Sequence, residues 1–176
     1  MDYVDFEEYK DLVNLTEAEL EEIIVKDSSD KARYIIGVKA IEGNDLEKVK
    51  KNEKKGVSWL REAATSDHID SQEYLAYYDI RFEKVPNVKR IMAYLEAVVD
   101  KKDSTRALTT LAEFLLNQRN EKKSIERGFE LYKKAADLGD LVACYWVGVL
   151  CHRGQGVDKD VKTGVKYLEK ARSLGN

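Results

Sequence analysis

Apolar and polar positions follow a helical period twice within residues 139–176. In residues 143–153, the small and apolar residues that share one helix face are Ala143, Val147, Gly148, Leu150 and Cys151. In residues 161–174, the corresponding residues are Val161, Val165, Leu168, Ala171 and Leu174. Gly154 and Gly156 lie between the two patterns, where a helix end and a tight turn favour residues that accept a positive φ. The segment is therefore predicted to be one helix–turn–helix unit.

This unit recurs upstream with a period of 36 to 37 residues. The first-helix pattern has equivalents at residues 107–117 and 71–81, and ARYIIGVKAIEG from Ala32 repeats the spacing of ACYWVGVLCHRG from Ala143. The second-helix pattern starts at Gly56, Met92, Gly128 and Gly164. Gly148 lies inside a predicted helix, where glycine costs about 1 kcal/mol relative to alanine, so we expect it to let another helix approach closely. Four helical hairpins in tandem predict an all-α fold, an α–α superhelix or solenoid.

The repeated residues resemble the Sel-1-like repeat family, whose members are related to tetratricopeptide repeats. The fourth copy carries the family pattern at Ala143, Gly148, Gly154–Val157, Tyr167, Lys170–Ala171 and Gly175. The third copy keeps Tyr132, Lys134, Ala135, Ala136 and Gly139 but has Gln118-Arg119-Asn120 in place of the turn glycines. The second copy is the most divergent, with FEKVPN at the turn. The resemblance covers about residues 30–176 and implies adaptor or scaffold work without specifying a partner.

The first 29 residues have a different character, with ten acidic residues and two lysines, a net charge of −8. Thr16 and Glu19 have the spacing of a capping box, which predicts a helix that begins after Thr16. Solenoids need caps on their end repeats, so we predict an acidic N-terminal helical cap at 1–29; an arm that binds a partner is the alternative. The repeat solenoid then occupies 30–176, with repeats at about 30–66, 67–102, 103–138 and 139–176.

Composition narrows the classes of function. The chain has 176 residues with a net charge of −3, which gives no reason to expect nucleic-acid binding. No apolar run reaches the roughly 18 residues of a membrane span, and residues 1–11 lack the pattern of a signal peptide. We therefore expect a cytoplasmic protein, with a nuclear one as the alternative, and no membrane insertion. One basic cluster, of a kind used in nuclear import but more often a solvated loop, comprises Lys48, Lys50, Lys51, Lys54 and Lys55.

Residues for catalysis, metal binding or a cofactor do not form any known pattern, so we expect no catalytic residues, no metal and no cofactor. His68 and His152 lie about two repeats apart without a matched nucleophile. Cys144 and Cys151 are seven residues apart on one predicted helix, a rise of about 10 Å, which is too far for a disulfide. Both thiols are expected to be buried and inert.

A binding surface is predicted from the first helices, which line the concave wall in tetratricopeptide-like solenoids. Large apolar residues recur on the side of these helices away from Gly148 and its equivalents, and exposed apolar patches usually mark contact sites. The predicted partner-binding groove comprises Tyr34, Val38, Ile41, Tyr77, Ile80, Arg81, Leu116, Tyr145, Val149, His152 and Arg153. The competing interpretation is that neighbouring helices bury these side chains.

The favoured function is a non-catalytic adaptor or scaffold that binds a protein or peptide partner along this groove. A structural subunit that assembles through the ends of the solenoid is the alternative. A β-lactamase-like hydrolase, an activity described for some relatives, is less favoured because no nucleophile with its base is found. In the C-terminal repeat, Tyr167, Ala171 and Leu174 form an apolar stripe, while Val161, Val165 and Leu168 are expected to pack on their own hairpin. The favoured interpretation is a small stripe shielded by Lys166, Lys170 and Arg172; the alternatives are a homodimer, a chain that continues past Asn176, or another partner that covers the stripe.

Overall fold

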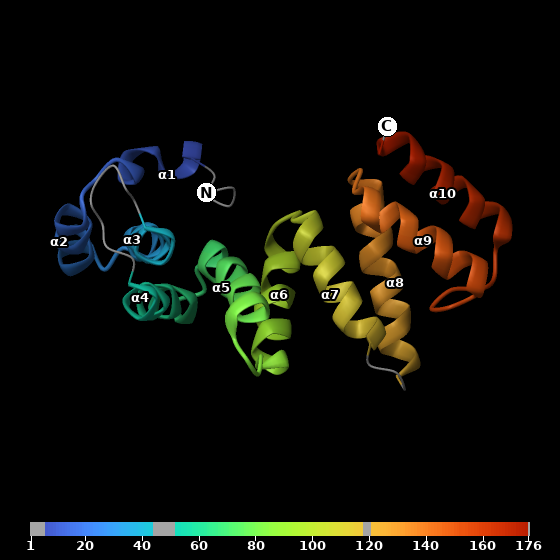
Figure 1. The fold of residues 1–176 in the computed structure, drawn as a ribbon, viewed down its shortest axis with the longest axis horizontal. Coiled ribbons are helices and arrows are strands. Elements are labelled where there is room, and N and C mark those ends of the chain that lie inside the picture. The colour runs from blue at the N-terminus through green and yellow to red at the C-terminus, as the bar shows by residue number, and fades with distance from the viewer. Residues whose placement is uncertain (1–5, 44–51, 118–120, 176) are drawn as a thin grey trace. The chain divides into compact units, whose positions relative to one another are not determined.

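The computed structural model describes residues 6–43, 52–117 and 121–175, with side chains from Glu8 onward. Within these ranges the regular structure is all helical and comprises ten helices, α1 to α10 (Figure 1). The chain divides into two compact units, residues 1–94 and 95–176. Helix α6, Val88–Lys101, contributes its first half to one unit and its second half to the other. The predicted all-α repeat fold is confirmed.

The amino-terminal unit contains five complete helices, which are α1 Phe6–Val13, α2 Glu17–Asp27, α3 Asp30–Glu42, α4 Glu53–Thr65 and α5 Ile69–Phe82. The carboxy-terminal unit contains four, which are α7 Thr105–Asn117, α8 Lys122–Asp137, α9 Leu141–Arg153 and α10 Val161–Leu174. The most extensive helix contacts are within the hairpins α3–α4, α7–α8 and α9–α10. Contacts between α4 and α5 join the first hairpin to α5, and contacts between α8 and α9 join the two hairpins of the carboxy-terminal unit.

Local sequence determines where several helices begin and end. The Thr16 side chain accepts the backbone N–H of Glu19, while Glu19 accepts the backbone N–H of Thr16, so the predicted capping box is present. Asp140 and Asp160 cap α9 and α10 in the same way, each accepting a backbone N–H three residues on. The predicted turn between α9 and α10 uses Gly154 and Gly156 at φ of 68° and 74°, values that favour glycine.

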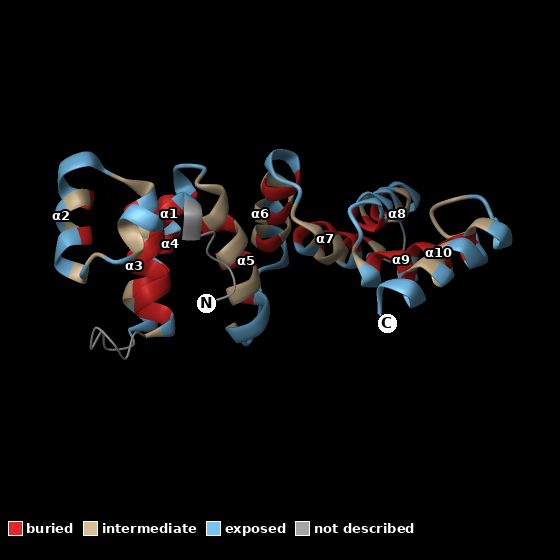
Figure 2. Cartoon of the chain, turned by 90° about the horizontal axis from the view of Figure 1, so that it is seen from above, coloured by how far each residue is buried: buried red, intermediate tan, exposed pale blue. Residues whose placement is uncertain are grey.

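Helix α3 is the centre of the amino-terminal unit, because other helices pack on it from several sides. Most of its residues are buried, as the colouring in Figure 2 shows. Helices α1 and α2 cover one side of α3 with Tyr9, Leu20 and Ile24, and all three side chains are buried in the same cluster. This arrangement explains why α3 does not have the single apolar stripe of a surface helix.

The basic cluster is described only in part, since Lys48, Lys50 and Lys51 lie outside the described residues. Lys55 forms ion pairs with the predicted N-terminal cap, since its Nζ lies 2.6 Å from the carboxylate of Glu17 and 2.8 Å from that of Glu21, both on α2. These two contacts join α4 to α2 at the protein surface. Exposed pairs of this kind stabilise a fold by less than about 1 kcal/mol each.

Candidate interaction surfaces

Three predicted groove residues belong to the core of the amino-terminal unit. Tyr34, Val38 and Ile41 are buried, so the expectation that they line an open surface is wrong. The ring of Tyr9 lies 5.2 Å from that of Tyr34, and the ring of His68 lies 5.5 Å from it on another side. Helix periodicity correctly placed the three side chains on one face of α3. It does not show that Tyr9 and His68 cover Tyr34, or that Ile41 packs on Gly56 of α4.

Polar groups connect α1 to the start of α5 above Tyr34. The Nδ1 of His68 accepts the backbone N–H of Ser71 and so caps α5. Its Nε2 lies 3.2 Å from the Tyr9 hydroxyl, which donates to the carboxylate of Asp70. Because Nδ1 accepts a hydrogen bond, Nε2 carries the proton of the neutral ring. The Nε2–H group therefore donates a hydrogen bond to the oxygen of the Tyr9 hydroxyl. Burial lowers the pKa of His68, which keeps the ring neutral in this arrangement.

Helix α5 presents an exposed surface that partly matches the prediction. Ile80 and Arg81 are exposed and Tyr77 is half-buried, so these three side chains lie at or near the surface. The most exposed aromatic residue, however, is Phe82, which the prediction missed because it falls outside the chosen helix face. Its ring lies 5.0 Å from that of Tyr78, at the edge of a surface depression of about 600 Å³ between α4 and α5.

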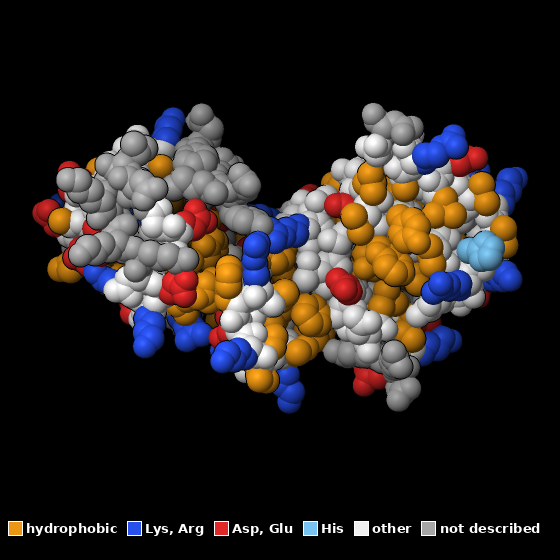
Figure 3. All heavy atoms as spheres, viewed as in Figure 1, with side chains coloured by type: hydrophobic (Ala, Val, Ile, Leu, Met, Phe, Trp, Pro, Cys, Tyr) orange, Lys and Arg blue, Asp and Glu red, His pale blue; other side chains and the backbone are white. Residues whose placement is uncertain are grey.

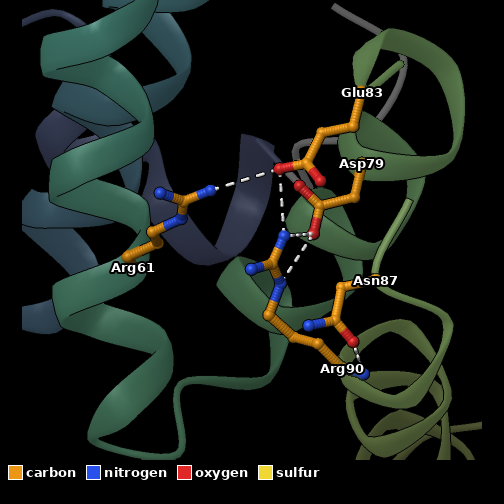
Figure 4. Close-up of polar contacts among 5 residues, drawn as sticks. All are labelled: Arg61, Asp79, Glu83, Asn87 and Arg90. Atoms are coloured by element: carbon orange, nitrogen blue, oxygen red, sulfur yellow. Dashed lines mark hydrogen bonds and ion pairs between the residues drawn. The ribbon is translucent and has the colours of Figure 1, made fainter. Parts of the chain in front are cut away.

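A buried ion pair lies beside this depression, where α5 ends and α6 begins (Figure 4). Asp79 is 1% exposed, and its Oδ2 accepts from Arg90 Nε at 3.0 Å and from Nη2 at 2.7 Å. Arg90 also reaches Glu83 at 3.0 Å, and Arg61 of α4 reaches Glu83 at 3.4 Å. Burial raises the pKa of Asp79, and the Arg90 guanidinium opposes that rise by favouring the carboxylate. Asn87 orients Arg90 by accepting its backbone N–H.

Asp79 occupies a core position of the repeat. One or two periods away, the equivalent residues are Ala40, Leu115 and Cys151, all of them buried. An aspartate in this column is tolerated because Arg90 neutralises it, and the pair fixes the turn whose sequence, FEKVPN, lacks the glycines of the fourth repeat. The sequence itself carries a signal for this pair, since position 79 has a charged residue where every other copy has an apolar one.

In the carboxy-terminal unit, the exposed side of α9 is the clearest interaction surface. We call it the α9 face; it comprises Val142, Tyr145, Trp146, Val149, His152 and Arg153, which share one side of the helix. Tyr145 is 49% exposed, while Val149 is half-buried. Trp146 is 37% exposed and was missed by the prediction. Figure 3 shows hydrophobic side chains gathered over α9 on the visible side of this unit.

The aromatic residues of the α9 face pack against α8 and against each other. The Trp146 ring stacks on that of Tyr132 of α8 with centroids 6.1 Å apart, and Tyr145 meets the edge of Trp146 at 5.6 Å. Tyr132 is buried, which raises the pKa of its hydroxyl to about 12 and keeps it uncharged beneath Trp146. A stacked pair of this kind is worth about 1 kcal/mol beyond its buried area. Trp146 is therefore fixed in place while one side of it stays open to solvent.

Leu116, the remaining predicted groove residue, points toward the partner helix of its own hairpin. A Cβ placed on Gly128 of α8 would lie 3.0 Å from the Cγ of Leu116, so the leucine fills the space that this glycine leaves. Leu116 is accordingly half-buried. The structure thus brings Tyr145, Val149, His152 and Arg153 together on α9 and assigns Leu116 to hairpin packing.

Reactive groups are few in the described part of the chain. Cys144 and Cys151 are buried free thiols, and burial raises the pKa of both, which confirms the prediction for their environment. Among the residues described, no group of three or more histidine, cysteine or carboxylate side chains is placed to hold a metal ion. No described helix combines the length and the apolar character that crossing a membrane requires.

The sequence profile of the Sel1 repeat matches residues 31–68, 105–140 and 141–176. These segments correspond to three of the four predicted repeats, and the divergent second repeat, with the Asp79–Arg90 pair, falls between them. No curated protein matches the sequence.

Several solved structures are similar to this chain. A protective antigen of uropathogenic Escherichia coli, c5321, displays an SLR fold and matches with a TM-score of 0.75, 20% identity and 93% of this chain covered. A Sel1 repeat protein from Oxalobacter formigenes matches with a TM-score of 0.66, 20% identity and 86% coverage. Cysteine-rich protein B of Helicobacter pylori matches with a TM-score of 0.52 and 26% identity, over 72% of this chain and 90% of that one. The chain spans 34% of the first relative and 59% of the second.

Proposed function

Because the chain belongs to the Sel1 repeat family, we propose that it is a non-catalytic adaptor that binds a protein partner through the α9 face. Sel1 repeats typically form scaffolds for protein–protein interaction, and members of the family are generally non-catalytic. The family leaves the binding surface and the partner open, so both are assigned from the properties of this chain.

The observation that carries the proposal is the exposure of Tyr145 and Trp146 next to each other on a rigid support. Tyrosine and tryptophan are the residues most enriched at binding hot spots, and a fixed ring loses little conformational entropy when a partner covers it. Val142 extends the apolar surface toward the start of α9 and Val149 toward its end. The spacing of these residues suits a partner that lays an apolar helix face or an apolar strand along α9.

The charged residues at the end of the α9 face indicate how the proposed partner would be oriented along the helix. His152 and Arg153 lie in the last turn of α9 and are exposed, so the end of the α9 face is basic. An acidic residue that follows the apolar anchors of the partner would meet Arg153 there. Such rim charges mainly change the association rate and its salt dependence, whereas the aromatic anchors determine how long the complex lasts.

The test is affinity purification with mass spectrometry, comparing the intact chain with a Tyr145→Ala, Trp146→Ala variant. A matched control is Val25→Ala on α2, because Val25 is highly exposed and lies outside the α9 face. We expect one set of proteins to be retained by the intact chain and the control but lost from the aromatic variant. Recovery of the same proteins with all three chains, with thermal melting unchanged, would disprove the assignment of the α9 face.

A β-lactam hydrolase is the less favoured function, and a direct assay separates it from the adaptor. The purified chain is expected to leave a chromogenic β-lactam intact over hours at micromolar protein. Turnover that survives repeated purification and varies with the chain concentration would favour the hydrolase.

A further inference from the structure

A single tyrosine side chain attaches α1 to α3 and to the start of α5 in the amino-terminal unit. This residue, Tyr9, is 2% exposed, although α1 has only eight residues. Its ring lies 5.2 Å from that of Tyr34 and meets the edge of the His68 ring at 6.2 Å. The ammonium group of Lys31 lies 5.5 Å from the centre of the same ring. We call the groups around this tyrosine the Tyr9 site, which comprises Lys31, Tyr34, His68 and Asp70.

The Tyr9 site binds the hydroxyl group as well as the ring. The hydroxyl oxygen accepts from the Nε2–H of His68 at 3.2 Å, and the hydroxyl proton is donated to the carboxylate of Asp70. Burial raises the pKa of Tyr9, so the phenol keeps the proton that it donates. One donor and one acceptor at the end of the ring favour tyrosine over phenylalanine, because phenylalanine would remove both hydrogen bonds.

His68 is an unusual residue at its position in the repeat. The residues that cap the first helices of the other three repeats are Ser29, Ser104 and Asp140, each accepting a backbone N–H three residues on. Serine and aspartate are among the best helix caps, and histidine is not among them. His68 caps α5 through Nδ1 in the same way, and its second nitrogen contacts Tyr9. The contact with a tyrosine therefore explains the histidine better than the cap does.

Helix α1 is held on the repeats mainly by this one side chain. Between Glu8 and Val13 only Tyr9 is buried, while Leu12 and Val13 are half-buried. Glu8 pairs with Lys31 at 2.9 Å, but both side chains are exposed, and exposed pairs contribute little to stability. A helix of eight residues is not stable in water without its packing, so α1 unfolds when Tyr9 leaves its site.

The chain that follows α1 is attached more firmly. The carbonyl oxygen of Leu15 accepts from the Nζ of Lys39, a buried residue, at 2.6 Å. Leu20 of α2 is fully buried, and Lys55 pairs with two carboxylates of α2. Helix α1 can therefore leave the repeats by a movement before Leu15, while α2 stays in place on α3.

We propose that α1 is a displaceable internal ligand of the Tyr9 site, and that a tyrosine on an acidic amphipathic helix of a partner protein takes its place. The sequence of α1, FEEYKDLV, indicates the chemistry of that partner. An acidic residue before the tyrosine pairs with Lys31, as Glu8 does. Apolar residues three and four positions after it pack on the core, as Leu12 and Val13 do.

The connection between α1 and α2 makes the Tyr9 site selective. A tethered segment has a high effective concentration at its own site, so a free partner has to bind tightly or be in excess to displace α1. Helix α1 thus keeps the site closed to weak ligands. The site is separate from the α9 face and lies in the other compact unit, so it adds a second binding surface to the proposed adaptor.

Fluorescence anisotropy with a labelled peptide of residues 6–15 tests this proposal in the full chain. The peptide should bind the Tyr9→Ala chain at least about 10-fold more tightly than the wild type, whose own α1 competes with it. The same peptide carrying Tyr9→Phe should bind the Tyr9→Ala chain roughly 10-fold more weakly, since it lacks the hydroxyl group. His68→Asn, added to Tyr9→Ala in the chain, keeps a cap for α5 but should weaken peptide binding by a similar factor.

Tyr145→Ala is the matched control, because Tyr145 has the repeat position of Tyr34 but belongs to the α9 face. Added to Tyr9→Ala, it should leave the affinity for the peptide unchanged. A peptide that fails to bind a folded Tyr9→Ala chain overturns the proposal. So does binding that Tyr145→Ala abolishes, because the peptide would then occupy the α9 face.

Hydrogen exchange in the wild type keeps the test valid if Tyr9→Ala folds poorly. The amides of residues 10–13 should exchange at least about 100-fold faster than those of residues 20–24 in α2, because α1 opens by itself. An excess of the peptide should speed the exchange of residues 10–13 further, since it occupies the Tyr9 site. Equal protection of α1 and α2 would overturn the proposal, because α1 would then be a fixed part of the fold.

Discussion

Gly148 and Gly164 face each other across the hairpin of α9 and α10, and a Cβ on either would lie 2.9 Å from the carbonyl oxygen of the other. Gly37 and Gly56 have the same relationship across α3 and α4, at 3.0 Å and 2.6 Å. Missing side chains therefore let the two helices of a hairpin touch through their backbones. The expectation that Gly148 allows close approach of another helix is confirmed.

Gly148→Ala is predicted to destabilise the protein even though alanine favours helices. The new Cβ would lie 2.6 Å from the Cγ of Leu168 and press on the backbone of α10, an overpacking that costs about 1–3 kcal/mol. Gly128→Ala is the control, since its Cβ would meet the flexible Leu116 at 3.0 Å and gains about 1 kcal/mol of helix propensity. Urea unfolding should show a loss for the first variant and little change for the second. Equal stability of both variants would contradict the close contact.

Arg90→Met is predicted to destabilise the amino-terminal unit by about 3 kcal/mol, because it leaves the Asp79 carboxylate buried without its counter-ion. Asp79→Leu in the same chain should recover much of the loss by restoring an apolar residue to that core position. A double-mutant cycle followed by chemical unfolding measures the coupling between the two residues. Additive effects of the single changes would show that the pair contributes no specific interaction. Lys89→Met, one residue earlier on α6 and exposed, controls for the change of charge.

His68 is predicted to make the protein less stable in mild acid. Its folded pKa is lowered by burial from the ordinary 6.5, so the unfolded chain binds the proton first as the pH falls. The stability from neutral His68 is therefore complete above about pH 7 and is lost as the pH falls through 6.5 and then through the lower folded pKa. His68→Asn keeps a helix cap that does not titrate, so it should flatten the decrease in melting temperature between pH 7 and pH 5.

The exposed His152 provides the control for that measurement, because His152→Asn removes a histidine without touching the contact of Tyr9 with His68. The melting temperature of His152→Asn should decrease between pH 7 and pH 5 by the same amount as that of the wild type. A decrease of the same size in all three proteins would show that other groups cause the acid sensitivity. In that case the next substitutions would be made at the charged groups that act on His68, which are Asp70, Asp30, Glu8 and Lys31.

Leu20→Ala is predicted to cost about 3 kcal/mol, because the side chain is fully buried between α2 and α3 and its loss leaves a cavity. Val25→Ala, on the exposed side of the same helix, should change stability by less than about 0.5 kcal/mol. Thermal melting of the two variants measures how firmly the acidic segment is attached to the repeats. A melting temperature unchanged by Leu20→Ala would show that α2 does not contribute to the stability of the fold.

Sequence alone determined the repeat architecture of this protein. A helical period, its recurrence every 36 to 37 residues and the glycines at 148, 154 and 156 are local properties, and each restricts backbone conformation or the approach of two helices wherever the chain lies. The capping box at Thr16 follows from the same local rules. These features therefore agree between sequence and structure.

Tertiary structure decided which apolar faces are open. Periodicity shows that Tyr34 and Tyr145 occupy equivalent faces, but only packing shows that α1 and α5 cover the first while the second stays exposed. The same holds for Val161 and Val165 of α10, which the helical pattern places inside their own hairpin although both are exposed, and for Ala171 of the predicted stripe, which is buried. Burial depends on residues far away in sequence, whereas the pattern that predicts a helix depends on neighbours within a few turns.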